Sequence, residues 1–277
     1  DILLKKIRAI ITNQSNEYEY FLGGIDMIAS DTISFIKKDI LVFSFAVILF
    51  IIIVLHLIYR DLKWVLIPLI TTGYSVLTMT GLIGFFNWEI TAISSNFISL
   101  MLILSISMNI HIINHYQTNY KNTDDFNNFK YTFTQMFWPC LYTALTTIVA
   151  FGSLIFSNIK PIIDFGFIMV VSLLIIFLSS FTILPLLIYI FPKVKKIKNY
   201  DFSILKTLQI ISIKHSKKII LLNIVFFVIS IVGINKLNVE NSFINYFKSD
   251  TQIHKGMKLI DTELGGTTPL DIIIKFK

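Results

Sequence analysis

Six long stretches of apolar residues, separated by short polar connections, dominate this 277-residue chain. They have 18 to 27 residues each. An α-helix needs about 20 residues to cross a bilayer core of about 30 Å. They run over Ile40–Tyr59, Val65–Phe86, Ile93–Ile113, Phe137–Phe156, Phe165–Phe191 and Ile219–Lys236. Apolar residues make up 55% of the chain and the mean hydropathy is +0.73. Both values exceed what a soluble domain needs to fill a single hydrophobic core. The sequence therefore predicts a mainly α-helical bundle of six transmembrane helices.

Lysine and arginine predict the orientation of these helices. The first, third and fifth connections are basic, and the fifth alone holds eight lysines between residues 193 and 218, whereas the other two connections hold only Lys160. We therefore expect the basic connections to be cytoplasmic and both termini to lie outside a plasma (inner) membrane. The net charge of +7 is thus mainly a topology signal and not a sign of nucleic-acid binding. Contact of the 193–218 loop with anionic lipid is a secondary alternative.

The two flanks differ from the middle, because charged residues alternate there with turn signals. Helical patterns at 2–10 and 25–36 surround a strand-like run, Tyr18–Leu22. After the last span, a helical stretch Thr251–Leu264 precedes a strand-like run, Pro269–Phe276. Both flanks are predicted to be parts of soluble α+β domains. Since residue 1 is Asp and the last strand looks cut short, we expect both ends to be boundaries within a longer polypeptide.

A set of polar, glycine and proline residues recurs at fixed spacing along the fourth and fifth spans. Its members are Thr143, Thr146, Thr147, Phe151, Ser153, Leu154, Ser157, Pro161, Phe165, Gly166, Leu184 and Pro185. With the sequence HIINHY at 111–116 and the run Tyr59-Arg60-Asp61 before Pro68, this set resembles the resistance-nodulation-division (RND) superfamily. The similarity is to its MMPL-like branch of lipid and hydrophobe exporters, which includes the sterol-sensing-domain proteins.

The resemblance implies a domain organisation. It makes residues 1–39 the end of a first external porter domain and 40–192 a five-helix membrane bundle. Residues 193–218 become a cytoplasmic basic linker, 219–237 the helix that opens a second repeat, and 238–277 the start of a second porter domain. The remaining half of the same polypeptide is then a partner, and a homo-oligomer is left open.

Several of the matched residues also have a physical interpretation. Gly152 and Gly166 allow close helix approach, and Pro185 predicts a tilt or kink near the end of the long fifth span. The hydroxyls of Thr143, Thr146 and Thr147 can bond their own backbone or a neighbouring helix, so they are helix-packing candidates.

The third span carries polar groups, which are expensive in hydrocarbon and usually functional. At 100° per residue, Asn96, Ser107, His111 and Asn114 fall within about 60° of one another, on a face that we expect to look into the bundle. Asn109, another candidate, lies on the opposite side with Ser105. His111 either relays protons or only donates a hydrogen bond to a neighbouring helix.

Proton-coupled proteins of the resembled type carry an acidic residue a few positions before this histidine. Here that position is at or near Met108, between Ser107 and Asn109, and none of the three is ionisable. The resemblance implies a proton-driven exporter of lipid-like or amphiphilic substrates. The alternatives are a lipid- or sterol-sensing scaffold that does not transport, and an accessory to protein translocation.

An enzyme is not expected, because the zinc, nucleophile-elbow and phosphate-loop motifs are missing. No cofactor or metal is predicted. The lone cysteine, Cys140, cannot form a disulfide within the chain.

Overall fold

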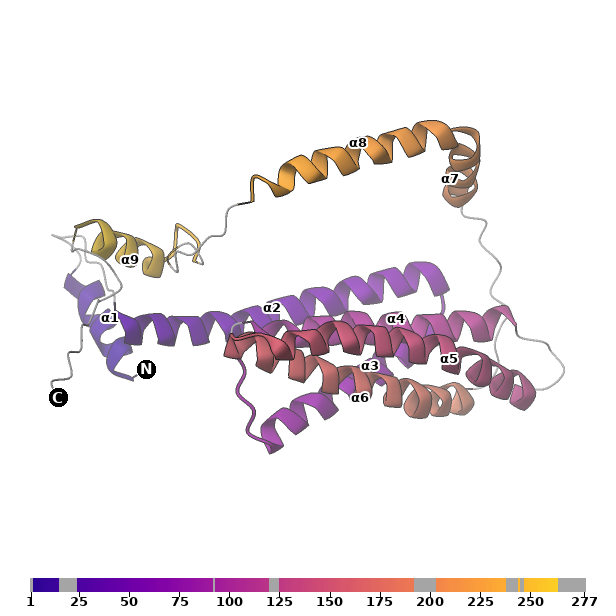
Figure 1. Ribbon diagram of the computed structural model, residues 1–277. Coiled ribbons are helices and arrows are strands. Elements are labelled where there is room, and N and C mark those ends of the chain that lie inside the picture. The colour runs from indigo at the N-terminus through magenta and orange to yellow at the C-terminus, as the bar shows by residue number, and fades with distance from the viewer. Residues whose placement is uncertain are drawn as a thin grey trace, which may run out of the picture. The chain divides into compact units, whose positions relative to one another are not determined.

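A computed structural model describes residues 2–14, 24–91, 93–119, 125–191, 203–237, 244 and 247–263 (Figure 1). The described residues form helices joined by short turns. These are α1 (Ile2–Gln14), α2 (Ile25–Tyr59), α3 (Leu62–Phe85), η1 (Ser94–Asn96), α4 (Phe97–Thr118), α5 (Asp125–Gly152), η2 (Ser153–Phe156), α6 (Lys160–Ile190), α7 (Ser203–Lys214), α8 (Ser216–Ile234) and α9 (Gln252–Glu263).

Six of these segments are long and apolar enough to cross a membrane, as predicted. They run over Met27–Tyr59, Leu62–Phe85, Ser94–Thr118, Phe126–Phe156, Lys160–Ile190 and Ser216–Ile234. Large apolar side chains such as Phe45, Leu77 and Val149 are about 70% exposed on these helices, as expected for surfaces that meet lipid. The chain is therefore a multi-pass membrane protein.

The first span is longer than expected. The helical pattern at 25–36 and the span at 40–59 were predicted as separate elements, but they form one continuous helix, α2. Neither glycine nor proline occurs between Ile25 and Tyr59, so nothing in the sequence interrupts the helix. The helix ends at a sharp corner, where Arg60 has a φ of 49° and the Asp61 side chain caps α3 by accepting from the Lys63 amide at 3.1 Å.

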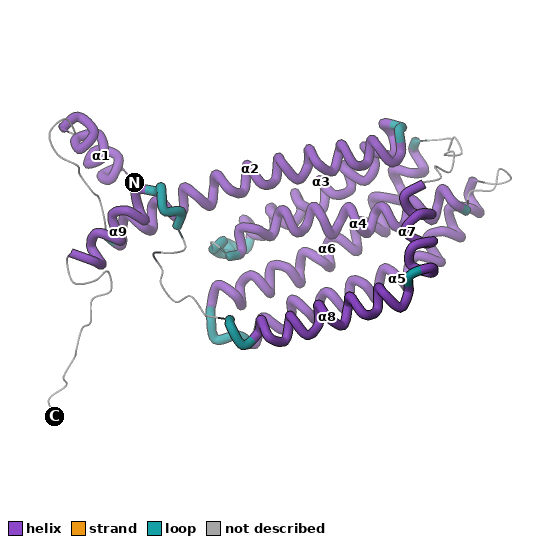
Figure 2. The backbone as a smooth tube through the Cα atoms, turned by 90° about the horizontal axis from the view of Figure 1, so that it is seen from above, coloured by secondary structure: helices purple, strands orange, loops and turns teal. Residues whose placement is uncertain are grey.

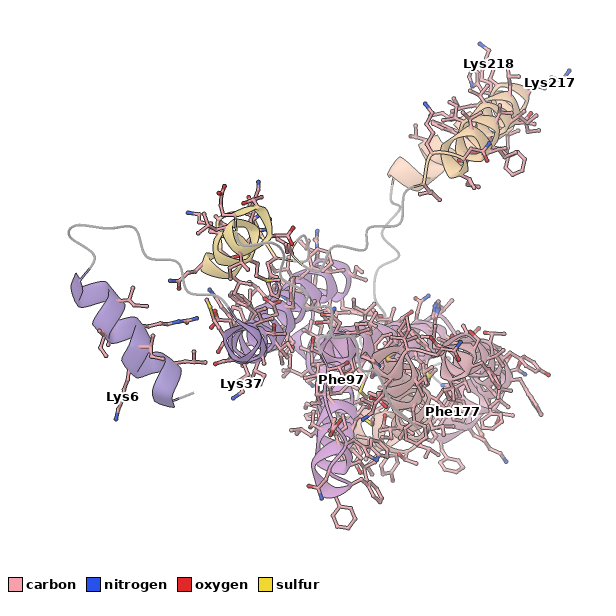
Figure 3. All side chains as sticks on the ribbon, turned by 60° about the vertical axis from the view of Figure 1, so that its left-hand side comes forward. Lys6, Lys37, Phe97, Phe177, Lys217 and Lys218 are labelled. Atoms are coloured by element: carbon pink, nitrogen blue, oxygen red, sulfur yellow. The ribbon has the colours of Figure 1, made fainter. Side chains whose placement is uncertain are left out.

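The chain divides into two units, Thr32–Ile197 and a second unit made of Asp1–Asp31 with Lys198–Lys277. In the first unit, α3, α4 and α6 contact one another pairwise and α5 packs on α6 (Figure 2). Their shared core is apolar, with Phe97, Met101 and Met169 fully buried. Figure 3 shows Phe97 and Phe177 within this dense set of side chains.

In the second unit, residues from the two ends of the chain share a small apolar core. Met27, Ile244, Ile253 and Met257 are buried there, against Leu4, Ile28 and Phe247. A hydrogen bond contributes, since the His254 ring lies 3.2 Å from the Ile244 carbonyl oxygen. An ion pair between Arg8 and Asp31 at 2.6 Å holds α1 to the beginning of α2.

The prediction of α+β flanks is not supported. Where the structure describes the flanks, at 2–14, 24–39, 244 and 247–263, it shows helices and turns without a strand. The two strand-like runs, Tyr18–Leu22 and Pro269–Phe276, lie outside the described residues.

Candidate functional site

A network of buried hydroxyl and amide groups joins three helices of the first unit. The side chains of Thr71, Thr72, Ser75, Ser105, Asn109, Ser172, Ser179 and Ser180 are buried almost completely. They come from α3, α4 and α6. Because unpaired polar groups are costly in such surroundings, their hydrogen bonds decide how these helices meet.

Asn109 of α4 lies at the centre of this network. Its Oδ1 accepts a hydrogen bond from the Ser180 hydroxyl of α6 at 2.8 Å. Its Nδ2 donates to Thr72 Oγ1 at 3.3 Å and to the Pro68 carbonyl at 3.5 Å, both on α3. One amide side chain thus joins three helices, which a hydroxyl cannot do with the same reach.

Further hydroxyl pairs extend the same contact. Thr72 and Ser105 share a hydrogen bond of 2.9 Å between α3 and α4, and Ser75 bonds Ser179 between α3 and α6. Ser75 also donates to the carbonyl of Thr71 one turn earlier in α3. The described part of α4 brings no carboxylate to this network, because Phe97–Thr118 contains no Asp or Glu.

The other face of α4 borders two cavities. The larger one has a volume of about 570 Å³ and lies between α2 and α4. Its walls are apolar apart from Ser107 and His111. The lining residues are Phe43, Ala46, Val47, Phe50, Ile51, Val54, Leu55, Ile103, Ile106, Ser107, Ile110 and His111.

A smaller cavity of about 220 Å³ lies between α4, α5 and α6. Ser107 and His111 line it as well, together with Cys140, Thr143 and Thr147. The imidazole of His111 therefore borders both cavities, on a ridge of α4. This placement makes His111 the centre of the candidate site.

The predicted polar face does not point into the bundle, and that expectation is wrong. In the described residues Asn96, Ser107, His111 and Asn114 are exposed, whereas Asn109, on the opposite side, is fully buried. The hydroxyls of α3 and α6 are the reason, because they supply hydrogen-bond partners only on the Asn109 side. Whether His111 relays protons stays a prediction.

The threonines predicted to aid helix packing bond within their own helix. Thr143 donates to the Pro139 carbonyl at 2.9 Å, Thr146 to that of Tyr142 at 3.0 Å, and Thr147 to that of Thr143 at 2.7 Å. Of the two interpretations, the structure thus shows own-backbone bonding, and Thr143 and Thr147 also line the smaller cavity.

Gly166 and Gly152 differ in how closely a neighbouring helix approaches them. A Cβ atom at Gly166 would lie 2.8 Å from the Phe151 carbonyl oxygen and 3.0 Å from Leu154 Cβ, so α6 approaches the end of α5 closely there. At Gly152 the nearest atom would be Val170 Cγ2 at 3.8 Å, an ordinary contact. Pro185 lies inside α6, which continues past it to Ile190.

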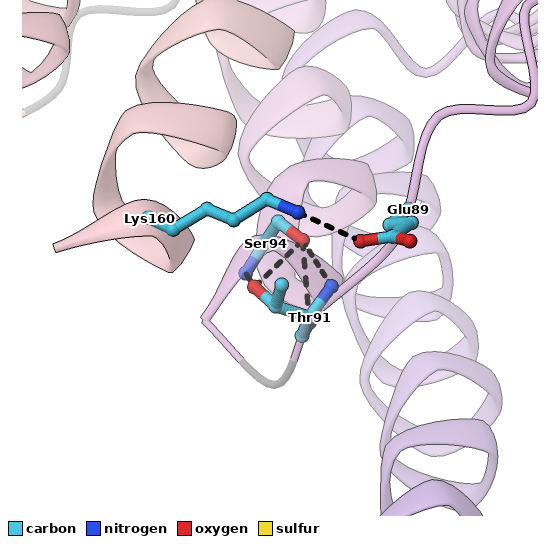
Figure 4. A network of polar contacts seen from close by, with 4 residues as sticks. All are labelled: Glu89, Thr91, Ser94 and Lys160. Carbon is cyan, nitrogen blue, oxygen red and sulfur yellow. Dashed lines mark hydrogen bonds and ion pairs between the residues drawn. The ribbon is translucent and has the colours of Figure 1, made fainter. Parts of the chain in front are cut away.

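The ends of α3 and α6 meet through an exposed polar contact (Figure 4). Lys160 pairs with Glu89 at 3.2 Å, and both side chains are about 75% exposed. Next to Glu89, Thr91 and Ser94 cap the start of the α4 segment reciprocally, each hydroxyl accepting from the amide of the other residue. Trp88 adds an edge-on contact with Phe167 at 5.0 Å between ring centres.

In the part of the chain that the structure describes, no three His, Cys, Asp or Glu side chains gather as metal ligands would. His115, near the end of α4, stacks on Tyr131 at 6.1 Å, away from the two cavities. The site thus consists of one imidazole, hydroxyls and apolar side chains. Such an arrangement can hold a hydrophobic molecule and accept or release a proton beside it.

Six apolar helices long enough to cross a bilayer, with polar groups buried between them, define the class of polytopic membrane proteins. The sequence profile of the MMPL family matches residues 3–201, and the chain belongs to this family. The resemblance found in the sequence is thereby confirmed. No curated protein sequence matches the chain.

Sequence reasoning missed the hydroxyl network, although a signal exists. Thr71 and Ser75 are four residues apart, as are Ser105 and Asn109, and Ser172 and Ser179 are seven apart. Both spacings place small polar residues on one side of a helix. Small polar stripes on three apolar helices indicate helix contacts in a membrane.

Proposed function

We propose that this chain is the membrane part of a secondary transporter that exports lipid-like or other hydrophobic molecules and draws on the proton gradient. The main support for this proposal is the cavity of about 570 Å³ between α2 and α4, whose walls are apolar except at Ser107 and His111. Ligand cavities in proteins commonly have about 300–1,000 Å³ and mainly apolar walls with few polar groups. Membership of a family of transporters supports the same function.

His111 supports the coupling part of the proposal. Imidazole is suited to carry a proton near neutral pH, and this one borders both the cavity between α2 and α4 and the cavity beside α5. Protonation would place a charge beside an apolar cavity. Since charge in hydrocarbon is unfavourable, the proton and the hydrophobic substrate would compete for the same space.

The test is transport by the purified protein in liposomes with an imposed pH gradient and a lipophilic fluorescent substrate. We expect the double variant His111→Ala/Asn114→Ala to lose about tenfold or more of the gradient-driven rate, equal to about 1.4 kcal/mol. Asn223→Ala is the matched control, because the Asn223 amide bonds only within α8, to the Ile219 carbonyl at 2.8 Å. Unchanged transport by the double variant would show that His111 and Asn114 have no role in gradient-driven transport.

A lipid-sensing membrane scaffold is the second candidate function. It is favoured by the fact that Asn109 and Met108 stand where the resemblance leads one to expect an acidic residue. A scaffold would bind the lipophilic probe in the same liposomes but would not move it when the gradient is applied. Binding and transport measured on one preparation therefore separate the two functions.

The proposed topology has both flanks outside a plasma membrane and the basic connections inside. The shared core of the second unit supports the placement of both flanks on one side of the membrane, because Met27 and Ile253 can meet only if an even number of crossings separates them. In a Cys140→Ala background, a membrane-impermeant thiol reagent added to intact cells should label Lys255→Cys and not Lys217→Cys. The reverse pattern would invert the topology. The porter-domain identity of the flanks and a second repeat remain predictions.

A further inference from the structure

The junction of α7 and α8 is a tight bend, which we call the elbow. Only His215 separates Lys214, the last residue of α7, from Ser216, the first residue of α8. The His215 amide donates to the Ile211 carbonyl at 2.9 Å, and the Ile219 amide donates to the His215 carbonyl at 3.0 Å. Helical hydrogen bonding thus reaches the bend from both sides, and α7 ends one residue before α8 begins.

The elbow lies at a membrane surface because α8 is a membrane-spanning helix. The apolar run of α8 begins at Ile219, one turn after its start. Its first turn therefore lies at the boundary between hydrocarbon and headgroups, and α7, one residue away, ends at that same depth.

The end of α7 presents apolar side chains. Ile210, Ile211 and Ile213 are exposed by 62%, 45% and 72%. At 100° per residue the three fall within an arc of about 160°, with Ser212 on the other side. Isoleucines on one side of a helix at this depth are typical of helices that lie in the membrane interface.

The same elbow is strongly basic. Lys214, Lys217 and Lys218 follow one another within five residues and are exposed, and Figure 3 shows the last two extending from the helix. The described stretch 203–237 contains no Asp or Glu, so no acidic side chain of the elbow itself neutralises them. A positive cluster beside exposed isoleucines complements a surface that is both anionic and apolar.

We propose that α7 and the Lys214–Lys218 elbow form a binding surface for anionic phospholipids, with the isoleucines inserted between acyl chains and the lysines on the headgroup phosphates. The occupant is lipid and not an acidic protein, because the isoleucines lie at the depth of the bilayer interface. Each lysine near an anionic membrane surface strengthens binding by about fivefold. This surface is independent of the transport cavity and of the proposed function.

The full chain in lipid nanodiscs provides the test. A polarity-sensitive fluorophore is attached at Ile213→Cys in a Cys140→Ala background. Its emission is compared in phosphatidylcholine discs and in discs with about a third of phosphatidylglycerol, a content at which juxtamembrane lysines are attracted. We expect a blue shift in the anionic discs, and its loss in the triple variant Lys214→Gln/Lys217→Gln/Lys218→Gln.

Three controls test whether the blue shift depends on positive charge at the elbow. Lys248→Gln/Lys255→Gln/Lys258→Gln removes the same charge from exposed positions elsewhere and should keep the shift, as should the triple Lys→Arg variant of the elbow. If the elbow Gln variant fails to fold, salt replaces it, because 1 M salt shortens the screening length to about 3 Å and should abolish the shift.

Two results would overturn the proposal. One is equal emission in both kinds of disc. The other is a blue shift in lipid-free detergent that grows with protein concentration, which would make the occupant a second copy of the chain.

Discussion

Asn109 and His111 are only two residues apart in the sequence, but they lie on opposite faces of α4 and have different surroundings. Asn109 is fully buried, and its amide hydrogen-bonds groups on α3 and α6. His111 is exposed and borders two cavities with mostly apolar walls. The network side contributes to the stability of the bundle. On the cavity side we expect a smaller contribution to stability, and there the proposed function assigns the proton to His111.

The largest expected effect comes from placing a charge on the network side. Asn109→Asp should cost about 3 kcal/mol of stability at pH 8, because an ionised carboxylate in the middle of a transmembrane helix is that unfavourable. The cost should fall as the pH is lowered toward 4, where the carboxyl is protonated and can keep its hydrogen bonds.

Unfolding can be followed by reaction of a thiol dye with Cys140, which is buried in the folded chain. Asn114→Asp makes the same chemical change at an exposed position near the end of α4 and should lose much less stability. Equal losses would show that the two faces do not differ.

A methyl group at the close contact between α5 and α6 should have the next largest effect. Gly166→Ala should lose about 1–3 kcal/mol, because the new Cβ meets a backbone carbonyl that cannot move alone. Gly152→Ala should change stability by less than about 1 kcal/mol, because its nearest contact is ordinary and alanine favours the helix. The same thiol-dye assay measures both, and a tolerated Gly166→Ala would mean that the tight packing does not matter.

Removing one hydroxyl from each side of the bundle should give a smaller difference in stability. Thr72→Val should lose about 1 kcal/mol, because Thr72 bonds Ser105 and Asn109 across helices. Thr147→Val should be close to neutral, because that hydroxyl bonds only its own helix. A cost at Thr147 equal to that at Thr72 would contradict this assignment of roles.

The smallest effect is expected outside both faces. Glu89→Gln removes the exposed ion pair with Lys160, and screening by water and salt makes such pairs weak. Stability should not change measurably in thermal unfolding at low or high salt. A clear salt-dependent loss would show that the contact between the ends of α3 and α6 matters for the bundle.

The helices were predictable from the sequence, and the side to which each polar group points was not. About 20 apolar residues between polar connections suffice to define a span, so all six were found. The absence of glycine and proline from 25 to 59 could also have predicted the length of α2.

The buried face of α4 was harder to predict. Helical periodicity only places Ser105 and Asn109 on one side of the helix and Ser107 and His111 on the other. Which pair is buried depends on partners elsewhere in the chain, such as Thr72 and Ser180, which the periodicity of one helix does not contain.

The small core shared by Met27, Ile253 and Met257 gives the chain a second connection besides its backbone. Residues near the start of the chain and residues near its end pack together there. A single cut of the backbone between residues 197 and 203 would leave two pieces that this core still joins.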